Sequence, residues 1–484
     1  MHLIEQQDEA LDYRRRYNGL IGVASKVPIR DRSILSLVYT PGVAEACLEI
    51  KRDASTSFDL TSRGNTVAIV TDGTDLYGME VAGTPEAALP LLESKSVLFK
   101  TFAGLDAFPI CLDQRDPFKV IDTVLALTPT FGAICLDHIR TPHAFTIADH
   151  LEKAANIPVF NNPHHGTSIL VLGALYNALK VTGRKMEETR VVIAGAGVAG
   201  VGVARLLHRV GVRDLVVCDR AGAIYPYRAE RMNWAKSYVA KESNPEHRRG
   251  SLADVLRGAD VFIGVSTGDI LTPEMVASMA PDPIVFALAL PTPEGDPELL
   301  KQAGAAVVAT GRSDYPNMMD ISLVFPGVFR GLLDSGAQNI RLRTLIFAAQ
   351  ALAELVPPSE LHRDNIVPHT FDFRVAPAIA AAVVRAAIDT GEATRQVDPE
   401  VVAENTRHYV YEGSLQPRIE PEKRPTGLKG RALALRHKHN GVLEIRNKIP
   451  IKDHHILNLL YLPPAALAPV AEVQENPSRV YDLT

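Results

Sequence analysis

An α/β fold with a doubly wound parallel sheet in the middle of the chain is predicted by two observations. Five short apolar runs between residues 189 and 311 alternate with segments of helical character; the runs are TRVVIAG, DLVVCD, ADVFIGVS, PIVFALAL and AAVVATG. These runs are apolar throughout, which is typical of parallel strands that helices cover on both faces.

The flanking regions complete a three-part organisation. Residues 1–165 mix short apolar runs with helical stretches, and we expect an N-terminal α/β domain there. The segment 168–183 is apolar nearly all round and too long for a strand, so it predicts a buried helix that ends at Gly183. The doubly wound domain is expected over 166–395, with a helix near 377–391. Residues 396–484 turn basic and rich in Pro and Gly, and are expected to form a separate extension of unknown role.

Composition restricts the class of protein. A net charge of −5 gives no reason to expect nucleic acid or an anionic membrane as partner. The four cysteines lie far apart, which argues against a disulfide framework and suits a reducing cytoplasm. The first residues lack an apolar signal core, and no apolar run approaches the roughly 20 residues of a membrane helix. We expect a cytoplasmic enzyme that acts on a small molecule.

The strongest local motif is a glycine-rich turn after the run TRVVIAG. Gly195, Gly197 and Gly200 form G-x-G-x-x-G with Val198 and Ala199 between them, at the start of a predicted helix. Such glycines allow a tight turn, a close approach of pyrophosphate and close helix–strand packing, and the helix N-terminus offers N–H groups to phosphates. The motif predicts a nicotinamide-dinucleotide site; the alternative is a glycine-tight turn without a ligand.

Residues at the ends of two further predicted strands extend this site. Asp219 ends the run DLVVCD nineteen residues after Gly200, where an acid binds the ribose hydroxyls and favours NAD. The adjacent Arg220 leaves NADP possible, because a guanidinium accepts a 2′-phosphate. The residues that end the run ADVFIGVS are also expected to approach the cofactor, because ligands gather at the carboxyl ends of parallel strands; they are Val265, Ser266 and Thr267.

Several segments, in the same order along the chain, resemble the malic enzyme family, especially its smaller bacterial type. They include LVYTPGVAEACLEI (37–50), NTVAIVTDGT (65–74), ESKSVLFKTFAGLDAF (93–108), FGAICLDHI (131–139) and IPVFNNPHHGTSI (157–169). The resemblance implies catalysis in a cleft between two domains, usually in a homodimer, and adds Thr167 to the cofactor-binding residues.

The same resemblance implies roles for Lys95 and Tyr39. In the family, lysine takes the proton from the 2-hydroxyl of malate during hydride transfer, a divalent metal polarises the ketone for decarboxylation, and tyrosine protonates the enol. A desolvated lysine is able to act as a base and a phenol as a proton donor. Taken without the flanking motifs, Lys95 would be a solvated surface residue and Tyr39 a core residue.

The sequence departs from the family at the metal positions. An acidic pair in N-L-E-D-I becomes Asp137 and His138, and the acids of D-D-x-x-G-T become Asn162 and Pro163. Mg²⁺ prefers carboxylates and waters, so a site of the usual type is not expected and the need for a divalent metal is in doubt. The alternative is a softer ion held by Asp137, His138 and His164.

The expected substrate positions differ as well. Asp75 stands where many family members carry an arginine, which would turn attraction for a carboxylate into repulsion. Leu290 replaces an asparagine, and Asp320 and Ile321 replace an Asn-Asn pair. Glu80 lies in a stretch that replaces a glycine-rich family motif.

Three hypotheses follow. The first, which we favour from the sequence, is an NAD-linked oxidoreductase that acts on a hydroxy or amino acid other than malate, without the usual metal. In it, acids such as Asp75, Glu80 and Asp320 face a cationic group, and Leu290 and Ile321 contact an apolar part. The second is a malic enzyme that converts malate to pyruvate and carbon dioxide with a compensated metal site. The third is a non-catalytic descendant that binds NAD.

Overall fold

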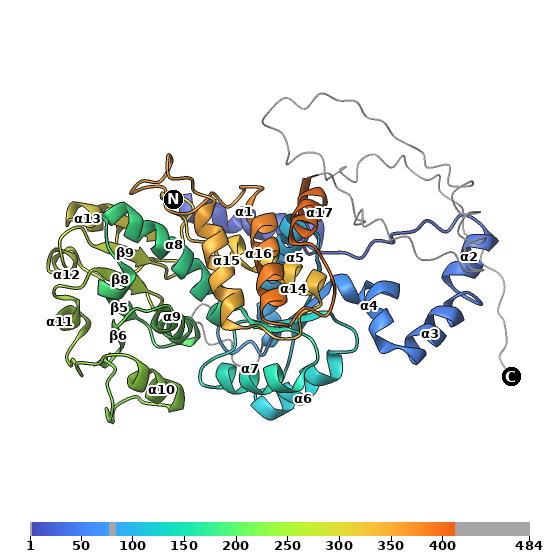
Figure 1. Cartoon of the computed structure of the whole chain (residues 1–484), viewed down its shortest axis with the longest axis horizontal. Helices are drawn as coiled ribbons and strands as arrows, with labels where there is room; N and C mark the ends of the chain where they lie inside the picture. Colours follow the sequence, from blue (N-terminus) through green and yellow to red (C-terminus); the bar gives the residue numbers. More distant parts are fainter. Residues whose placement is uncertain (1, 77–83, 412–484) are drawn as a thin grey trace, which may run out of the picture. The chain divides into compact units, whose positions relative to one another are not determined.

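A computed structural model describes residues 2–76 and 84–411 of the chain. They belong to one compact unit that ends at Arg418. This part of the chain contains two sheets with helices packed against them, which confirms the predicted α/β class (Figure 1).

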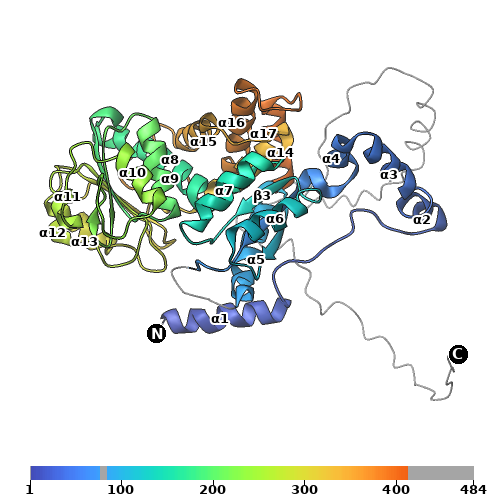
Figure 2. The same ribbon diagram turned by 90° about the horizontal axis from the view of Figure 1, so that it is seen from below.

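The first sheet has four parallel strands in the order β2-β1-β3-β4. They are β1 (Thr66–Thr71), β2 (Asp106–Cys111), β3 (Ala133–Leu136) and β4 (Val159–Asn161). Around β3 lie three helices, α5 (Leu89–Ala103), α6 (Pro117–Leu127) and α7 (His143–Ala154) (Figure 2). Every residue of β1 is buried, so the centre of this sheet forms the core of the first domain.

The second sheet has the order β10-β9-β8-β5-β6-β7, and only the short β7 at its edge runs antiparallel. Its strands are β5 (Arg190–Ala194), β6 (Asp214–Asp219), β7 (Gly222–Ala223), β8 (Val261–Gly264), β9 (Ile284–Ala287) and β10 (Val307–Thr310). The chain thus runs outward from β5 in both directions, which is the predicted doubly wound topology.

Helices cover both faces of the second sheet (Figure 1). On one side lie α8 (Thr167–Thr182) and α9 (Val198–Arg209), and on the other α11 (Leu252–Leu256), α12 (Pro273–Ala277) and α13 (Pro297–Gln302). Alternate residues of β5 enter different cores, since Val191 packs in one hydrophobic cluster and Val192 in the other. The predicted buried helix is α8, and Gly183 ends it in a left-handed conformation with φ 68°. α10 (Trp234–Glu242) follows β7.

The helices after β10 contact both domains, since Asn177 of α8 donates from Nδ2 to the carbonyl of Ala353 at 2.9 Å. They are α14 (Phe325–Ser335), α15 (Leu342–Glu354), α16 (Val375–Asp389) and α17 (Pro399–Tyr411). The Phe99 ring of α5 lies 4.6 Å from that of Phe325 and 5.0 Å from that of Phe329, so α14 packs against the first domain. Gly331 lets α14 approach α16, because a Cβ there would lie 2.6 Å from the carbonyl oxygen of Ala380.

The domain boundaries expected from the sequence stay a prediction. The expected doubly wound domain, 166–395, contains α14, which packs against α5 of the first domain. The segment 399–411, expected in the extension, forms α17, and its Val402 packs with Ala380 and Val384 of α16. The rest of the expected extension and Glu80 lie outside the described residues.

The N-terminal segment carries helices of another character. α1 (His2–Tyr17) precedes α2 (Arg32–Val38) and α3 (Val43–Arg52), and neither α2 nor α3 has a buried residue. By length and composition, Arg32–Arg52 is the one stretch of the described residues apolar enough to cross a membrane, although none of it is buried and it breaks between the two helices. The remaining short elements are η1 (Ala54–Thr56), α4 (Ser57–Leu60), η2 (Ser62–Asn65), η3 (Pro85–Ala88), η4 (Asn162–Gly166), η5 (Met186–Glu188) and η6 (Ile321–Leu323).

Candidate active site

A buried polar cluster lies where β3 and β4 end. Asp137 directly follows β3 and is 1% exposed, and its backbone N–H donates to the carbonyl of Val70 at the end of β1. Lys95 of α5, 8% exposed, donates from Nζ to Asp137 Oδ2. Asn162, which follows β4, donates from Nδ2 to the same oxygen at 3.1 Å. The parallel sheet therefore brings together three residues far apart in sequence.

The ionisation of Asp137 follows from these contacts. Burial alone raises the pKa of this carboxyl, but the charges of Lys95 and His138 and the hydrogen bonds from Lys95 and Asn162 outweigh burial, so its pKa lies below the usual value. Asp137 is thus a carboxylate at neutral pH, and it holds Lys95 in place as the partner of a buried ion pair.

His138 links Asp75 to this cluster. Its Nδ1 lies 2.8 Å from the carbonyl oxygen of Asp75, and the Asp75 N–H donates to the His138 carbonyl at 3.1 Å. Its Nε2 lies 3.5 Å from Asp137 Oδ1. Burial lowers the pKa of His138, although the Asp137 charge opposes this. The predicted substrate residue Asp75 is therefore adjacent to Asp137 through this ring.

The other predicted substrate residues lie at two places. Ile321 lies near Asn162, since a Cβ on Gly166 would lie 3.0 Å from both Asn162 Oδ1 and Ile321 Cδ1. Asp320 precedes Ile321 and accepts the N–H of Ser322 at 2.9 Å, as the cap of η6. Leu290 lies after β9, 47% exposed, and packs near Gly311. The structure thus places Asp75 and Ile321 near the cluster.

Tyr39 is separate from Lys95 in this chain. It ends α2, is 67% exposed, and has no side-chain hydrogen bond to any residue that the structure describes. The structure therefore does not join the two catalytic residues expected from the sequence.

The residues of the softer-metal alternative do not make a metal site. In the ranges 2–76 and 84–411, no group of three His, Cys, Asp or Glu side chains is placed to hold an ion. The Nδ1 atom of His164 is buried and has no hydrogen-bond partner among the described residues, and desolvation holds the pKa of this ring well below the usual value. Neither His164 nor His138 joins Asp137 in a converging ligand set.

The glycine-rich turn has the geometry that the motif predicts. Gly195 has φ 121°, and a Cβ on it would meet the carbonyl of Val265 and lie 3.2 Å from Ser266 Cβ. A Cβ on Gly200 would overlap the carbonyl oxygen of Gly195, while one on Gly197 would meet nothing within 4 Å. The first and third glycines are therefore needed for packing, and the second faces open space at the uncapped start of α9.

The remaining predicted cofactor residues surround this turn. Val198 and Ala199 form the first turn of α9, and Thr267 is exposed after β8. Thr167 begins α8 beside α9, where a Cβ on Gly202 would lie 2.9 Å from the Ser168 hydroxyl. Glu294, which the sequence analysis missed, accepts the N–H of Ser266 at 3.0 Å and that of Ala289 at 2.9 Å, and so ties together the loops after β8 and β9.

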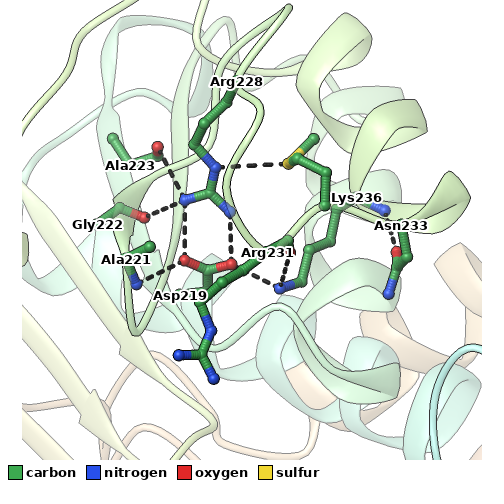
Figure 3. A network of polar contacts seen from close by, with 9 residues as sticks. Asp219, Ala221, Gly222, Ala223, Arg228, Arg231, Asn233 and Lys236 are labelled. Atoms are coloured by element: carbon green, nitrogen blue, oxygen red, sulfur yellow. Dashed lines mark hydrogen bonds and ion pairs between the residues drawn. The ribbon is translucent and has the colours of Figure 1, made fainter.

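Asp219, at the end of β6, is the centre of a network that the sequence analysis also missed (Figure 3). Arg228 donates from two nitrogens, at 2.8 and 2.5 Å, one to each carboxylate oxygen. Lys236 donates at 2.6 Å and the backbone of Ala221 at 2.9 Å. Although burial raises the pKa of Asp219, these donors lower it to about 2. A carboxylate has about four lone-pair sites, and here four donors use them.

Two further arginines, Arg220 and Arg231, lie near this network. The Arg231 carbonyl accepts from Lys236 Nζ at 2.8 Å (Figure 3), and Arg220 follows Asp219 directly. Both are exposed, and neither side chain has a hydrogen bond or ion pair within the described part of the chain. The end of β6 therefore carries one carboxylate and four cationic side chains.

Comparison with known proteins shows the family. The family model described as "Malic enzyme, N-terminal domain" matches residues 20–120, and "Malic enzyme, NAD binding domain" matches residues 165–388. The chain belongs to the malic enzyme family. It is therefore a member of a family of NAD(P)-dependent oxidoreductases, as the resemblance in the sequence implied.

Individual relatives of known sequence or structure support the same family assignment. A bifunctional malic/malolactic enzyme of Bacillus subtilis is 51% identical over 83% of this chain and 98% of its own. An NAD-dependent malic enzyme of Geobacillus stearothermophilus is 45% identical over 79% of each chain. The crystal structure of a malic enzyme from Pyrococcus horikoshii matches with a TM-score of 0.81 at 39% identity, over 84% of this chain and 97% of that one.

Proposed function

We propose that this malic enzyme family member oxidises malate with NAD or NADP and decarboxylates the product to pyruvate. Malate, the substrate of the second hypothesis, is thereby preferred over the substrates of the first, since relatives of 51% and 45% identity are named for malate. The observation within the chain that supports it most is the buried Lys95, held by Asp137 at the ends of parallel strands.

The chemistry of this proposal uses groups of the chain. Lys95 first gives the proton of its ammonium group to solvent. Hydride then leaves C2 of malate for the nicotinamide ring, while the proton of the 2-hydroxyl passes to the Lys95 amine. The Asp137 carboxylate stabilises the ammonium that forms. The electron pair released when carbon dioxide leaves then collects on the C2 oxygen, beside that ammonium, and Tyr39 donates the proton that completes pyruvate.

The test is incubation of the protein with L-malate and either NAD or NADP, with reduced nicotinamide and pyruvate measured together. We expect both products in equal amounts. Oxidation of a hydroxy or amino acid with a cationic group, and none of malate, would favour the first hypothesis. Cofactor binding without turnover of any such substrate would favour the third.

The first hypothesis is retained as a second candidate because of one observation. Asp75 is anchored beside Asp137 by His138, so two acids lie near the predicted substrate position. A substrate that carries an ammonium group would complement these charges better than a second carboxylate would.

The network around Asp219 bears on the choice of cofactor. The preference for NAD rests on an Asp219 carboxylate with lone pairs free for the ribose hydroxyls, but four donors already occupy them. We infer that NADP is accepted as well, because Arg220 and Arg231 are available for a 2′-phosphate.

Replacing these arginines tests the cofactor proposal. We expect Arg220→Ala combined with Arg231→Ala to raise the KM for NADP about tenfold, because each removes a charge-assisted bond to phosphate. The KM for NAD serves as the internal control and should change by less than about twofold. An equal change for both cofactors, or none for NADP, would contradict the proposal.

We also propose a homodimer in which the segment of α2 and α3 covers a second copy. Its exposed apolar side chains include Leu37 (61%) and Tyr39 (67%). Helices of 7 and 10 residues are not stable in water without packing, so their apolar faces require a partner. A second copy both buries these faces and provides a Lys95 for Tyr39.

Complementation between two inactive variants tests this dimer. Tyr39→Phe and Lys95→Gln should each abolish pyruvate formation alone. If the two residues come from different subunits, unfolding and refolding the variants together should restore about a quarter of the sites, because half of the dimers are mixed and each has one intact site. No recovery, with dimers shown by light scattering, would place both residues in one subunit.

A further inference from the structure

We infer that the cluster of Lys95, Asp137 and Asn162 is a metal-free catalytic centre, in which the Lys95 ammonium group supplies the positive charge that the family obtains from a divalent ion. The inference rests on the proposed function for the reaction, but its evidence is the donor chemistry of the cluster.

The atoms of Asp137 are already engaged. Its Oδ2 accepts from Lys95 and Asn162, and its Oδ1 accepts the N–H of His138 at 3.0 Å. A divalent ion bound through Oδ2 would lie next to the ammonium of Lys95, and like charges at that distance repel strongly in a buried site. The ion would therefore have to displace Lys95 from Asp137, its anionic partner among the residues that the structure describes.

The other positions offer little to a hard cation. Pro163 has no side-chain donor atom, and Asn162 supplies a neutral amide oxygen. The Nδ1 of His138 lies within hydrogen-bond distance of the Asp75 carbonyl. Of the four positions where the family carries acids, 137, 138, 162 and 163, only position 137 is still an acid in this chain. Mg²⁺ and Mn²⁺ sites prefer several carboxylates.

The substitutions also form a consistent set. The Asn162 amide nitrogen donates a hydrogen bond to Asp137. The family's acid at this position would instead place a second negative charge beside the Asp137 carboxylate. The Oδ1 atom of Asn162 is buried and without a partner among the described residues, next to Ile321. A hydrogen-bond donor of a bound ligand would satisfy this oxygen.

In such a centre Lys95 serves twice. Once the resting ammonium has given one proton to solvent, the amine takes the proton of the 2-hydroxyl while hydride passes from C2 to the nicotinamide, so the alcohol is oxidised and NAD(P) is reduced. As the ammonium so formed it holds the ketone oxygen, which the family polarises with a metal. No further oxidant or reductant is required.

The experiment measures Mn²⁺ binding to the full chain by electron paramagnetic resonance, with no substrate present. A variant that restores the family's acids is the matched comparison; it carries Asp137→Glu, His138→Asp, Asn162→Asp and Pro163→Asp. We expect the natural chain to leave Mn²⁺ free at micromolar concentrations and the variant to bind about one ion per chain, at least tenfold more tightly.

Two results would overturn the inference. One is binding of one Mn²⁺ by the natural chain that Asp137→Asn abolishes. The other is a turnover of malate that a chelator removes and Mn²⁺ restores. If the variant does not fold, the natural chain and Asp137→Asn still decide the question. If the natural chain neither turns over malate nor binds Mn²⁺, the result contradicts the proposed function but leaves the inference about the metal standing.

Discussion

Lys95→Ala is expected to lower kcat for malate oxidation by about a thousandfold, because general acid–base catalysis by one positioned group contributes this much. The change also leaves Asp137 buried without its cation, which costs about 3–5 kcal/mol of folding free energy. Thermal unfolding must therefore accompany the kinetics.

Two further variants separate catalysis from folding. Lys95→Gln keeps a donor for Asp137 but takes no proton, so its activity should fall as far while its stability falls less. Lys100→Ala is the matched control, since Lys100 lies on the same helix but pairs with Asp106 at 2.8 Å near the surface. Full activity in Lys95→Gln, or equal losses in all three variants, would exclude Lys95 as the proton acceptor.

Gly200→Ala is expected to abolish cofactor binding and to destabilise the fold. A Cβ at this position would overlap the carbonyl oxygen of Gly195, which is backbone and cannot move without opening the turn between β5 and α9. Isothermal titration with NAD and NADP, together with thermal unfolding, measures both effects.

Gly197→Ala separates an effect on cofactor binding from an effect on folding. Its Cβ would meet nothing within 4 Å in the chain itself, so the variant should fold normally. Because the added methyl points into the space where pyrophosphate approaches the backbone, we expect the Kd for either cofactor to rise about tenfold or more. Unchanged affinity in Gly197→Ala would show that the cofactor does not bind at this turn.

The fold could be predicted from the sequence because its signals are local. Continuous apolar runs marked the strands, and the spacing of Gly195, Gly197 and Gly200 marked the turn that follows β5. Which sheet the later helices cover was not predicted, because position along the chain does not determine it. The glycine that lets α14 approach α16 was the available signal.

The site was predictable only in part. The family motifs pointed to Lys95 and Asp137, but not to their ion pair, which joins residues 42 apart. Arg228 and Lys236 were missed because they follow β7 in sequence but fold back to donate hydrogen bonds to Asp219 at the end of β6, and no sequence motif indicates these contacts. The exposure of Tyr39 was missed because no motif marks it; in the proposed dimer, a second copy covers this side chain.

Malate deuterated at C2 gives the most direct test of the central claim, that hydride passes from malate to the nicotinamide with Lys95 as proton acceptor. The reaction is run with NAD or NADP in the presence of a chelator, and the reduced cofactor is analysed by mass spectrometry. We predict one deuterium per reduced nicotinamide in the natural protein and none above background in Lys95→Gln. The account would be contradicted if the natural protein transferred no deuterium from malate to the cofactor but reduced the cofactor with a different substrate.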